Sequence, residues 1–172
     1  MDEAAIRLAL RVTARTTFVF FACAFAGSAL RDLFSGRFFT WLATKRDAFL
    51  VAMAVSHTVH LAAIVALFQL LGSSRLKLTT VAGGGLVYLL IYAVAIGAIM
   101  RLRGREPQSL LGSPRFEAVA LYLIWVIFAL AFVPRAISGW PVYSFFSAVA
   151  LAALCIRVAC VVRYRRAKVA AA

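Results

Sequence analysis

Two histidines, His57 and His60, are the residues of this chain best suited to chemistry. They are the only histidines among its 172 residues, and both lie near the centre of an apolar stretch that runs from about residue 48 to residue 71. Ionisable side chains at that depth in a membrane are costly, so by default they mark functional positions. At a spacing of three residues they lie on nearly the same face of a helix, one turn apart.

Three kinds of chemistry would use this pair: ligation of a metal or haem iron, a proton relay, or hydrogen bonds to neighbouring helices. Apart from Gln69, the stretch contains no other strongly polar residue. This favours a cofactor, with His60 and His57 as the candidate metal ligands. Residues three apart on one helix cannot occupy opposite axial positions of one haem, so a six-coordinate iron would need its second ligand from another helix.

Glu117 is a weaker candidate for cofactor binding. Residues 113–117 (SPRFE) have the pattern of a helix start, with Ser113 as the N-cap and an acid in the first turn, where the helix dipole favours it. We expect Glu117, like Asp47 and the other acids, to be solvated at the end of an apolar stretch. The sequence contains no nucleophile–base set and no paired carboxylates, so it predicts no catalytic residue.

The composition identifies the environment of these residues. Hydrophobic residues make up 65% of the chain and charged residues only 15%, against about 25% charged in an ordinary soluble domain. The formal net charge is +13, but the basic residues fall between long apolar runs rather than on a polar domain, which argues against a nucleic-acid binder. The pattern is that of a membrane protein with basic connections, in contact with the lipid bilayer.

The predicted fold is all-α: one integral-membrane helical bundle over residues 16–162, with about five transmembrane helices. A span needs roughly 20 apolar residues. An amphipathic N-terminal segment, residues 1–15, precedes the bundle, and a basic cytoplasmic tail, residues 163–172, follows it. The expected spans cover about residues 16–34, 48–71, 80–100, 116–133 and 141–162.

Basic residues predict the orientation, because cytoplasmic connections carry an excess of Lys and Arg. A cytoplasmic C-terminus in a bacterial inner membrane places twelve basic residues inside and six outside. The twelve are Arg31, Arg37, Lys45, Arg46, Arg101, Arg103, Arg105, Arg115, Arg163, Arg165, Arg166 and Lys168. The six are Arg7, Arg11, Arg15, Arg75, Lys77 and Arg135.

Small residues predict where helices approach closely. Cys23 and Gly27 are four residues apart in the first span, as are Ala22 and Ala26. The glycine triplet 83–85 lacks the lysine of a phosphate-binding loop. We therefore expect the triplet to serve helix packing.

Several short motifs occur in an order that resembles ferric-reductase-like transmembrane proteins of bacteria, a group related to the haem-bearing membrane subunit of the methionine sulfoxide reductase system. The resemblance covers about residues 11–135, and the order and spacing of the motifs carry most of it. The motifs are residues 11–16 (RVTART), 41–57, 56–61 (SHTVHL), 83–86 (GGGL) and 121–125 (LYLIW).

The resemblance implies a b-type haem held between helices, with His60, or His57 beside it, as an axial ligand. The chain departs from the family at two places. Residues 46–51 (RDAFLV) stand where members usually have Arg-Arg-x-Leu-Gly-Leu, and Glu117 stands where members usually carry a histidine, eight residues before Trp125.

The resemblance therefore implies an electron-carrying membrane subunit of an oxidoreductase, which needs a redox partner protein because we expect no flavin or nicotinamide domain here. Two alternatives stay open. One is a structural or assembly membrane protein of the same family that binds no haem. The other is a small proton or solute transporter that uses the intramembrane histidines. Whether the chain forms an oligomer stays open as well.

Overall fold

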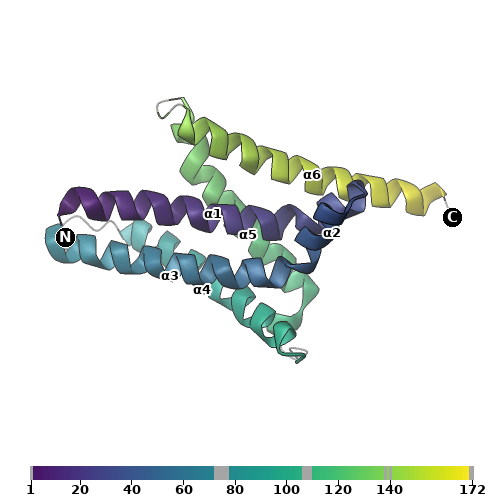
Figure 1. Ribbon diagram of the computed structural model, residues 1–172, viewed down its shortest axis with the longest axis horizontal. Coiled ribbons are helices and arrows are strands. Elements are labelled where there is room, and N and C mark those ends of the chain that lie inside the picture. Colours follow the sequence, from purple (N-terminus) through teal and green to yellow (C-terminus); the bar gives the residue numbers. More distant parts are fainter. Residues whose placement is uncertain (1, 72–77, 106–109, 138, 140, 171–172) are drawn as a thin grey trace. The chain divides into compact units, whose positions relative to one another are not determined.

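The computed structural model describes residues 2–71, 78–105, 110–137, 139 and 141–170; for residues 78–83 and 170 it describes the backbone only. Every regular element in this part of the chain is a helix, as predicted (Figure 1). The elements are α1 (Glu3–Leu33), α2 (Arg37–Thr44), α3 (Arg46–Leu71), α4 (Leu78–Leu102), η2 (Leu110–Gly112), α5 (Pro114–Phe132), η3 (Val133–Arg135) and α6 (Val142–Ala170).

Five of these helices are long and apolar enough to cross a membrane: α1, α3, α4, α5 and α6. Their outer faces carry large apolar side chains, such as Leu89 and Leu130, which are 70% and 66% exposed. Contiguous apolar surface of this kind needs a lipid environment or a partner to cover it. The protein is therefore a multi-pass membrane protein with an all-α fold.

The predicted amphipathic segment, residues 1–15, is helical and continues into the first span, because α1 runs through residue 15 without a break. The helix begins at Glu3, where Asp2 accepts a hydrogen bond from the Ala5 amide at 2.7 Å and acts as an N-cap. Glu3 also pairs with Arg7 one turn later, at 2.6 Å. No proline or glycine interrupts residues 3–26, so nothing in the sequence ends the helix at the predicted boundary.

The short helix α2 was not predicted, because its eight residues are too few to form a span. Gly36 separates it from α1 with a φ of +152°, a conformation that L side chains rarely adopt. One residue, Lys45, separates its end from the start of α3. The first connection is therefore a structured helix.

Contacts divide the chain into two compact groups, and α1 and α5 contribute to both. The first group comprises Met1–Phe21 and Asp47–Ile124, and the second comprises Ala22–Arg46 and Trp125–Ala172. Large, fully buried side chains in the first group include Phe18, Phe21, Leu50, Met53, Ile91 and Leu121. Because lipid tails are as apolar as these side chains, close packing rather than exclusion of water holds the helices together.

In the second group, Gly27 confirms one of the predicted close approaches. A Cβ atom at Gly27 would lie 3.3 Å from Leu42, so the glycine allows α2 to pack closely against α1. Arg157 of α6 contacts the same part of α1: it donates a hydrogen bond to the Phe25 carbonyl oxygen at 2.8 Å, and its guanidinium lies over the Phe25 ring.

The glycine triplet does not have its predicted role at Gly84 and Gly85. A Cβ atom at either residue would meet no atom of the described residues within 4 Å, and Gly83 lies outside the side chains that the structure describes. Close packing on α4 occurs instead at Gly97, where a Cβ atom would lie 2.9 Å from the Leu111 carbonyl oxygen of η2.

Candidate functional site

His57 and His60 lie on one face of α3, as their spacing predicts. Their rings are stacked, with centroids 5.4 Å apart and planes inclined by 13°. His57 is buried, with only 8% of its surface exposed, and His60 is half-buried. The first half of α1 lies beside α3 at this level (Figure 1).

Thr13 of α1 holds the ring of His60. Its Oγ1 atom lies 2.9 Å from His60 Nδ1 and 2.7 Å from the Ala9 carbonyl oxygen. A threonine hydroxyl has a single hydrogen. Since the carbonyl can only accept, that hydrogen goes to Ala9, and Nδ1 of His60 donates to Thr13. In this tautomer the other ring nitrogen, Nε2, is unprotonated and can accept a hydrogen bond or bind a metal.

A second polar contact between the same two helices lies one turn away. Thr17 Oγ1 of α1 lies 2.9 Å from Ser56 Oγ of α3. Ser56 also donates a longer hydrogen bond, 3.4 Å, to the Thr13 carbonyl oxygen. Thr17 pairs with Ser56 and Thr13 with His60, so the two helices run antiparallel and hydroxyl groups line the seam between them.

On its other side, His57 packs against α4. Its ring centroid lies 4.2 Å from that of Tyr88. Among the described residues, neither Nδ1 of His57 nor the hydroxyl of Tyr88 has a hydrogen-bond partner, and both atoms are buried. Thr58, the next residue of α3, joins its hydroxyl to that of Tyr92, one turn further along α4, at 2.9 Å. We name Thr13, Ser56, His57, His60 and Tyr88 the histidine cluster.

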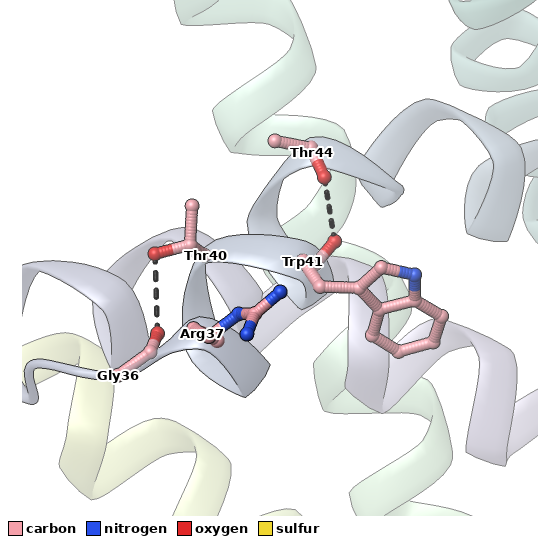
Figure 2. Close-up of a pocket in the computed structure, with 5 residues that line it drawn as sticks. All are labelled: Gly36, Arg37, Thr40, Trp41 and Thr44. Carbon is pink, nitrogen blue, oxygen red and sulfur yellow. Dashed lines mark hydrogen bonds between the residues drawn. The ribbon is translucent and has the colours of Figure 1, made fainter.

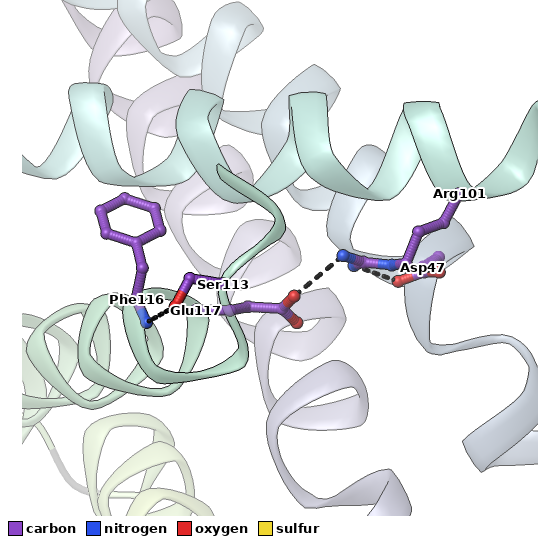
Figure 3. Close-up of polar contacts among 5 residues, drawn as sticks. All are labelled: Asp47, Arg101, Ser113, Phe116 and Glu117. Carbon is purple, nitrogen blue, oxygen red and sulfur yellow. Dashed lines mark hydrogen bonds and ion pairs between the residues drawn. The ribbon is translucent and has the colours of Figure 1, made fainter. Parts of the chain in front are cut away.

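Glu117 belongs to a different site, formed by the ends of three helices (Figure 3). Arg101 at the end of α4 makes two hydrogen bonds to Asp47 at the start of α3, at 2.9 Å and 2.6 Å. Its Nη1 atom lies 3.0 Å from Glu117 Oε2 at the start of α5. We name Asp47, Arg101 and Glu117 the charged cluster.

The charged cluster corrects the expectation that its two acids are solvated. The side chain of Glu117 is 12% exposed and that of Asp47 is 23% exposed, because Arg101 lies between them. Glu117 does lie in the first turn of a helix, as predicted. Ser113 is the N-cap, with its Oγ accepting a hydrogen bond from the Phe116 amide at 3.4 Å.

The structure brings His57 and His60 together but does not bring Glu117 to them. Through Arg101, Glu117 lies at the level of Asp47, ten residues before His57 on α3. At a rise of about 1.5 Å per residue, this places Glu117 roughly 15 Å from His57 along the helix axis. In the described part of the chain, no three His, Cys, Asp or Glu residues form a group that could hold a metal ion.

The sequence analysis missed three residues of these sites. Thr13 and Tyr88 are ordinary in an apolar helix, although Tyr88 and Tyr92 share a face of α4 at a spacing of four residues. Arg101 was counted only as a basic connection residue. Its proximity to two span-flanking acids depends on which helix ends meet, and no local pattern contains that information.

Comparisons with models of protein families, with curated proteins and with solved structures find no match for this chain.

Proposed function

We propose that this multi-pass membrane protein is an electron-carrying subunit of the ferric-reductase-like kind, and that His60 binds one b-type haem. A haem iron accepts and releases single electrons, which a partner protein would supply or take. The proposal builds on the order of the sequence motifs and on the environment of His60.

The observation that carries the proposal is the contact between Thr13 and His60. A metal-binding histidine usually donates its second ring N–H to a neighbouring oxygen, which fixes the tautomer and orients the ring. Thr13 Oγ1, 2.9 Å from Nδ1, is such an oxygen. His60 Nε2 is then left with the lone pair that an iron requires.

Among the described residues, His60 is the one that would hold the haem iron. The stacked rings of His57 and His60 lie on the same side of α3, so the two would not share that role. Glu117 is engaged by Arg101 at the far end of α3. His57 is instead a neighbour of the ligand, in contact with both His60 and Tyr88.

The proposed location is a bacterial inner membrane with the C-terminus in the cytoplasm. The distribution of basic residues supports it. The charged cluster supports the alternation of the spans, because the start of α3, the end of α4 and the start of α5 meet in it; the distribution of basic residues alone carries the orientation.

A second candidate function is a proton path, favoured by the unpartnered buried atoms of His57 and Tyr88. Buried polar atoms are nearly always hydrogen-bonded, and an exception needs an explanation. A proton or a water molecule that passes between the two atoms would provide one. The third possibility is a structural or assembly subunit without haem, which requires neither a metal-binding histidine nor a proton path.

Visible spectroscopy tests the haem proposal. We expect the protein purified from haem-replete cells to show a Soret band that sharpens and shifts on reduction. His60→Ala should lose the band and His57→Ala should retain most of it. The matched control is Gln69→Leu, which removes the other strongly polar side chain of residues 48–71 and should leave the spectrum unchanged.

Two outcomes would contradict haem binding: no Soret band in the wild-type protein, or a band that survives in the double variant His57→Ala/His60→Ala. In the first case, proton flux into liposomes decides between the remaining functions. Flux that the double variant abolishes supports the proton path, and no flux in the wild type supports the structural subunit.

A further inference from the structure

The short helix α2 carries a pocket on its surface. The pocket has a volume of about 590 Å³, and its lining comes from one segment: Gly36, Arg37, Thr40, Trp41 and Thr44. Figure 2 shows these side chains along one side of the helix. None of them belongs to the histidine cluster or to the charged cluster, so the proposed function leaves this pocket unassigned.

The spacing of the lining residues places them on the face of α2 that points away from the protein core. Arg37, Thr40, Trp41 and Thr44 follow the i, i+3, i+4, i+7 pattern of a single helix face. Leu42 lies on the other side, where it is 5% exposed and packs against Gly27. The helix is therefore anchored by Leu42 and presents the pocket outward.

Trp41 lines the pocket, and the neighbouring aromatic rings are poorly covered by protein. Phe38 is 63% exposed and Trp41 is 49% exposed, and their rings stack with centroids 6.1 Å apart. Phe34, just before the helix, is 50% exposed. Tryptophan and other aromatic side chains favour the headgroup level of a membrane, which α2 must occupy because it connects two spans.

The charge at this surface is positive. Arg37 and Lys45 are exposed, and residues 33–46 contain no acid. The nearest acids on either side are occupied, since Asp32 pairs with Arg31 and Asp47 pairs with Arg101.

The threonines cannot supply donors without losing bonds that they already make. Thr40 donates to the Gly36 carbonyl oxygen at 3.1 Å and Thr44 donates to the Trp41 carbonyl oxygen at 2.8 Å (Figure 2). The guanidinium of Arg37 is then the main donor toward a ligand in the pocket. Its planar fork of N–H groups matches the oxygens of a phosphate.

We propose that this pocket binds the phosphate of an anionic phospholipid, with Arg37 as the ligand to the phosphate and Trp41 and Phe38 beside the upper acyl chain. Positive charge alone would also attract free phosphate, but the exposed aromatic rings match a ligand with an attached apolar chain. A zwitterionic lipid presents the same phosphate without net negative charge, so the site prefers phosphatidylglycerol to phosphatidylcholine.

Quenching of Trp41 fluorescence by brominated lipids tests this proposal on the full-length protein in vesicles. The vesicles contain a minority of phosphatidylglycerol in phosphatidylcholine, with one lipid or the other brominated. The difference between the wild type and Trp41→Phe isolates the signal of Trp41. A basic residue near an anionic membrane surface contributes about 1 kcal/mol, which converts to an enrichment of about fivefold of phosphatidylglycerol around Trp41 over its share of the lipid.

We expect Arg37→Gln to remove this enrichment, and Arg165→Gln, an exposed arginine of the α6 tail, to leave it intact. Quenching of wild-type Trp41 in proportion to lipid composition would overturn the proposal. So would enrichment that persists in Arg37→Gln. Inorganic phosphate, added as a competitor, should not restore the fluorescence; if it does, the pocket binds free phosphate and the assignment to lipid is wrong.

Discussion

The histidine cluster and the charged cluster both connect helices of the first contact group, but they are built from different chemical groups. The charged cluster binds one cation between two carboxylates, at distances of 2.6–3.0 Å. The histidine cluster contains no acid, and two of its buried polar atoms have no hydrogen-bond partner among the described residues. The charged cluster is typical of a contact that holds helices together, whereas the histidine cluster leaves polar atoms available for a ligand or a proton.

The largest expected effect lies in the charged cluster. Arg101→Met leaves Asp47 and Glu117 largely buried without their shared cation, and breaking such a pair by removing one partner costs about 3 kcal/mol of unfolding free energy. Thermal or chemical unfolding in a neutral detergent measures this loss. The matched control is Arg103→Met, which removes an exposed arginine two residues away and should cost almost nothing.

A triple variant sharpens this test. Arg101→Met with Asp47→Asn and Glu117→Gln removes all three charges, so it should recover much of the lost stability, because no unpaired buried charge remains. If Arg101→Met alone is as stable as the wild type, the cluster does not join the helices.

The next largest effect on stability is expected from alanine substitutions at the two ends of α4. Gly97→Ala places a Cβ atom 2.9 Å from the Leu111 carbonyl oxygen, a backbone atom that cannot move aside easily. Overpacking of this kind costs about 2 kcal/mol. Gly84→Ala, at the other end of the helix and in open space, should instead stabilise by up to about 1 kcal/mol through helix propensity. Equal melting temperatures for the two variants would show that the two ends do not differ in packing.

Thr13→Val tests whether the histidine cluster orients a metal ligand. Losing the oxygen that accepts the His60 N–H should weaken haem binding about tenfold, the lower end of the effect for residues that support a metal ligand. Haem titration followed at the Soret band measures the affinity. Thr16→Val is the control, since Thr16 is exposed and bonds only to the Val12 carbonyl oxygen of its own helix. If the haem affinity of Thr13→Val equals that of the wild type, Thr13 does not orient the haem ligand.

The smallest expected effects on stability compare two tyrosines of α4. The hydroxyl of Tyr92 is hydrogen-bonded to Thr58, whereas that of Tyr88 has no partner among the described residues. Tyr92→Phe removes the interhelical bond to Thr58 and should cost about 0.6 kcal/mol, the average for such bonds in membranes. Tyr88→Phe removes a hydroxyl that has no partner among the described residues, so stability should stay the same or rise slightly. A loss of stability in Tyr88→Phe larger than in Tyr92→Phe would mean that the Tyr88 hydroxyl has a partner in the membrane.

The long helices were predictable because each is a long apolar run, and their number follows from the number of such runs along the chain. Helix α2 was not, since an eight-residue amphipathic segment between two spans has the composition of a connection. The sequence predicts the N-terminal segment and the first span as neighbours and does not say that they form one helix, although the local sequence contains no helix terminator.

Of the histidine cluster, only the contact between residues of the same helix could be predicted from the sequence. The stacking of His57 and His60 follows from their spacing. Their partners, Thr13 and Tyr88, depend on which faces of α1 and α4 meet α3. The partial burial of Glu117 likewise depends on an arginine sixteen residues earlier, at the end of another helix. Membrane helices expose apolar residues on nearly all faces, so the sequence pattern that identifies an inward face in a soluble protein is weak here.

The length of α1 makes bilayer thickness a physical variable for this protein. Its 31 residues extend about 46 Å, whereas the hydrocarbon core of a bilayer is about 30 Å thick. Because Arg7, Arg11 and Arg15 lie in its first half, this helix extends beyond the hydrocarbon core or tilts, by an amount that changes with lipid chain length. Residues of this one helix contact His60 in the first group and Leu42 in the second. A change of tilt in a thinner or thicker membrane therefore changes the contacts that α1 makes with His60 and with Leu42.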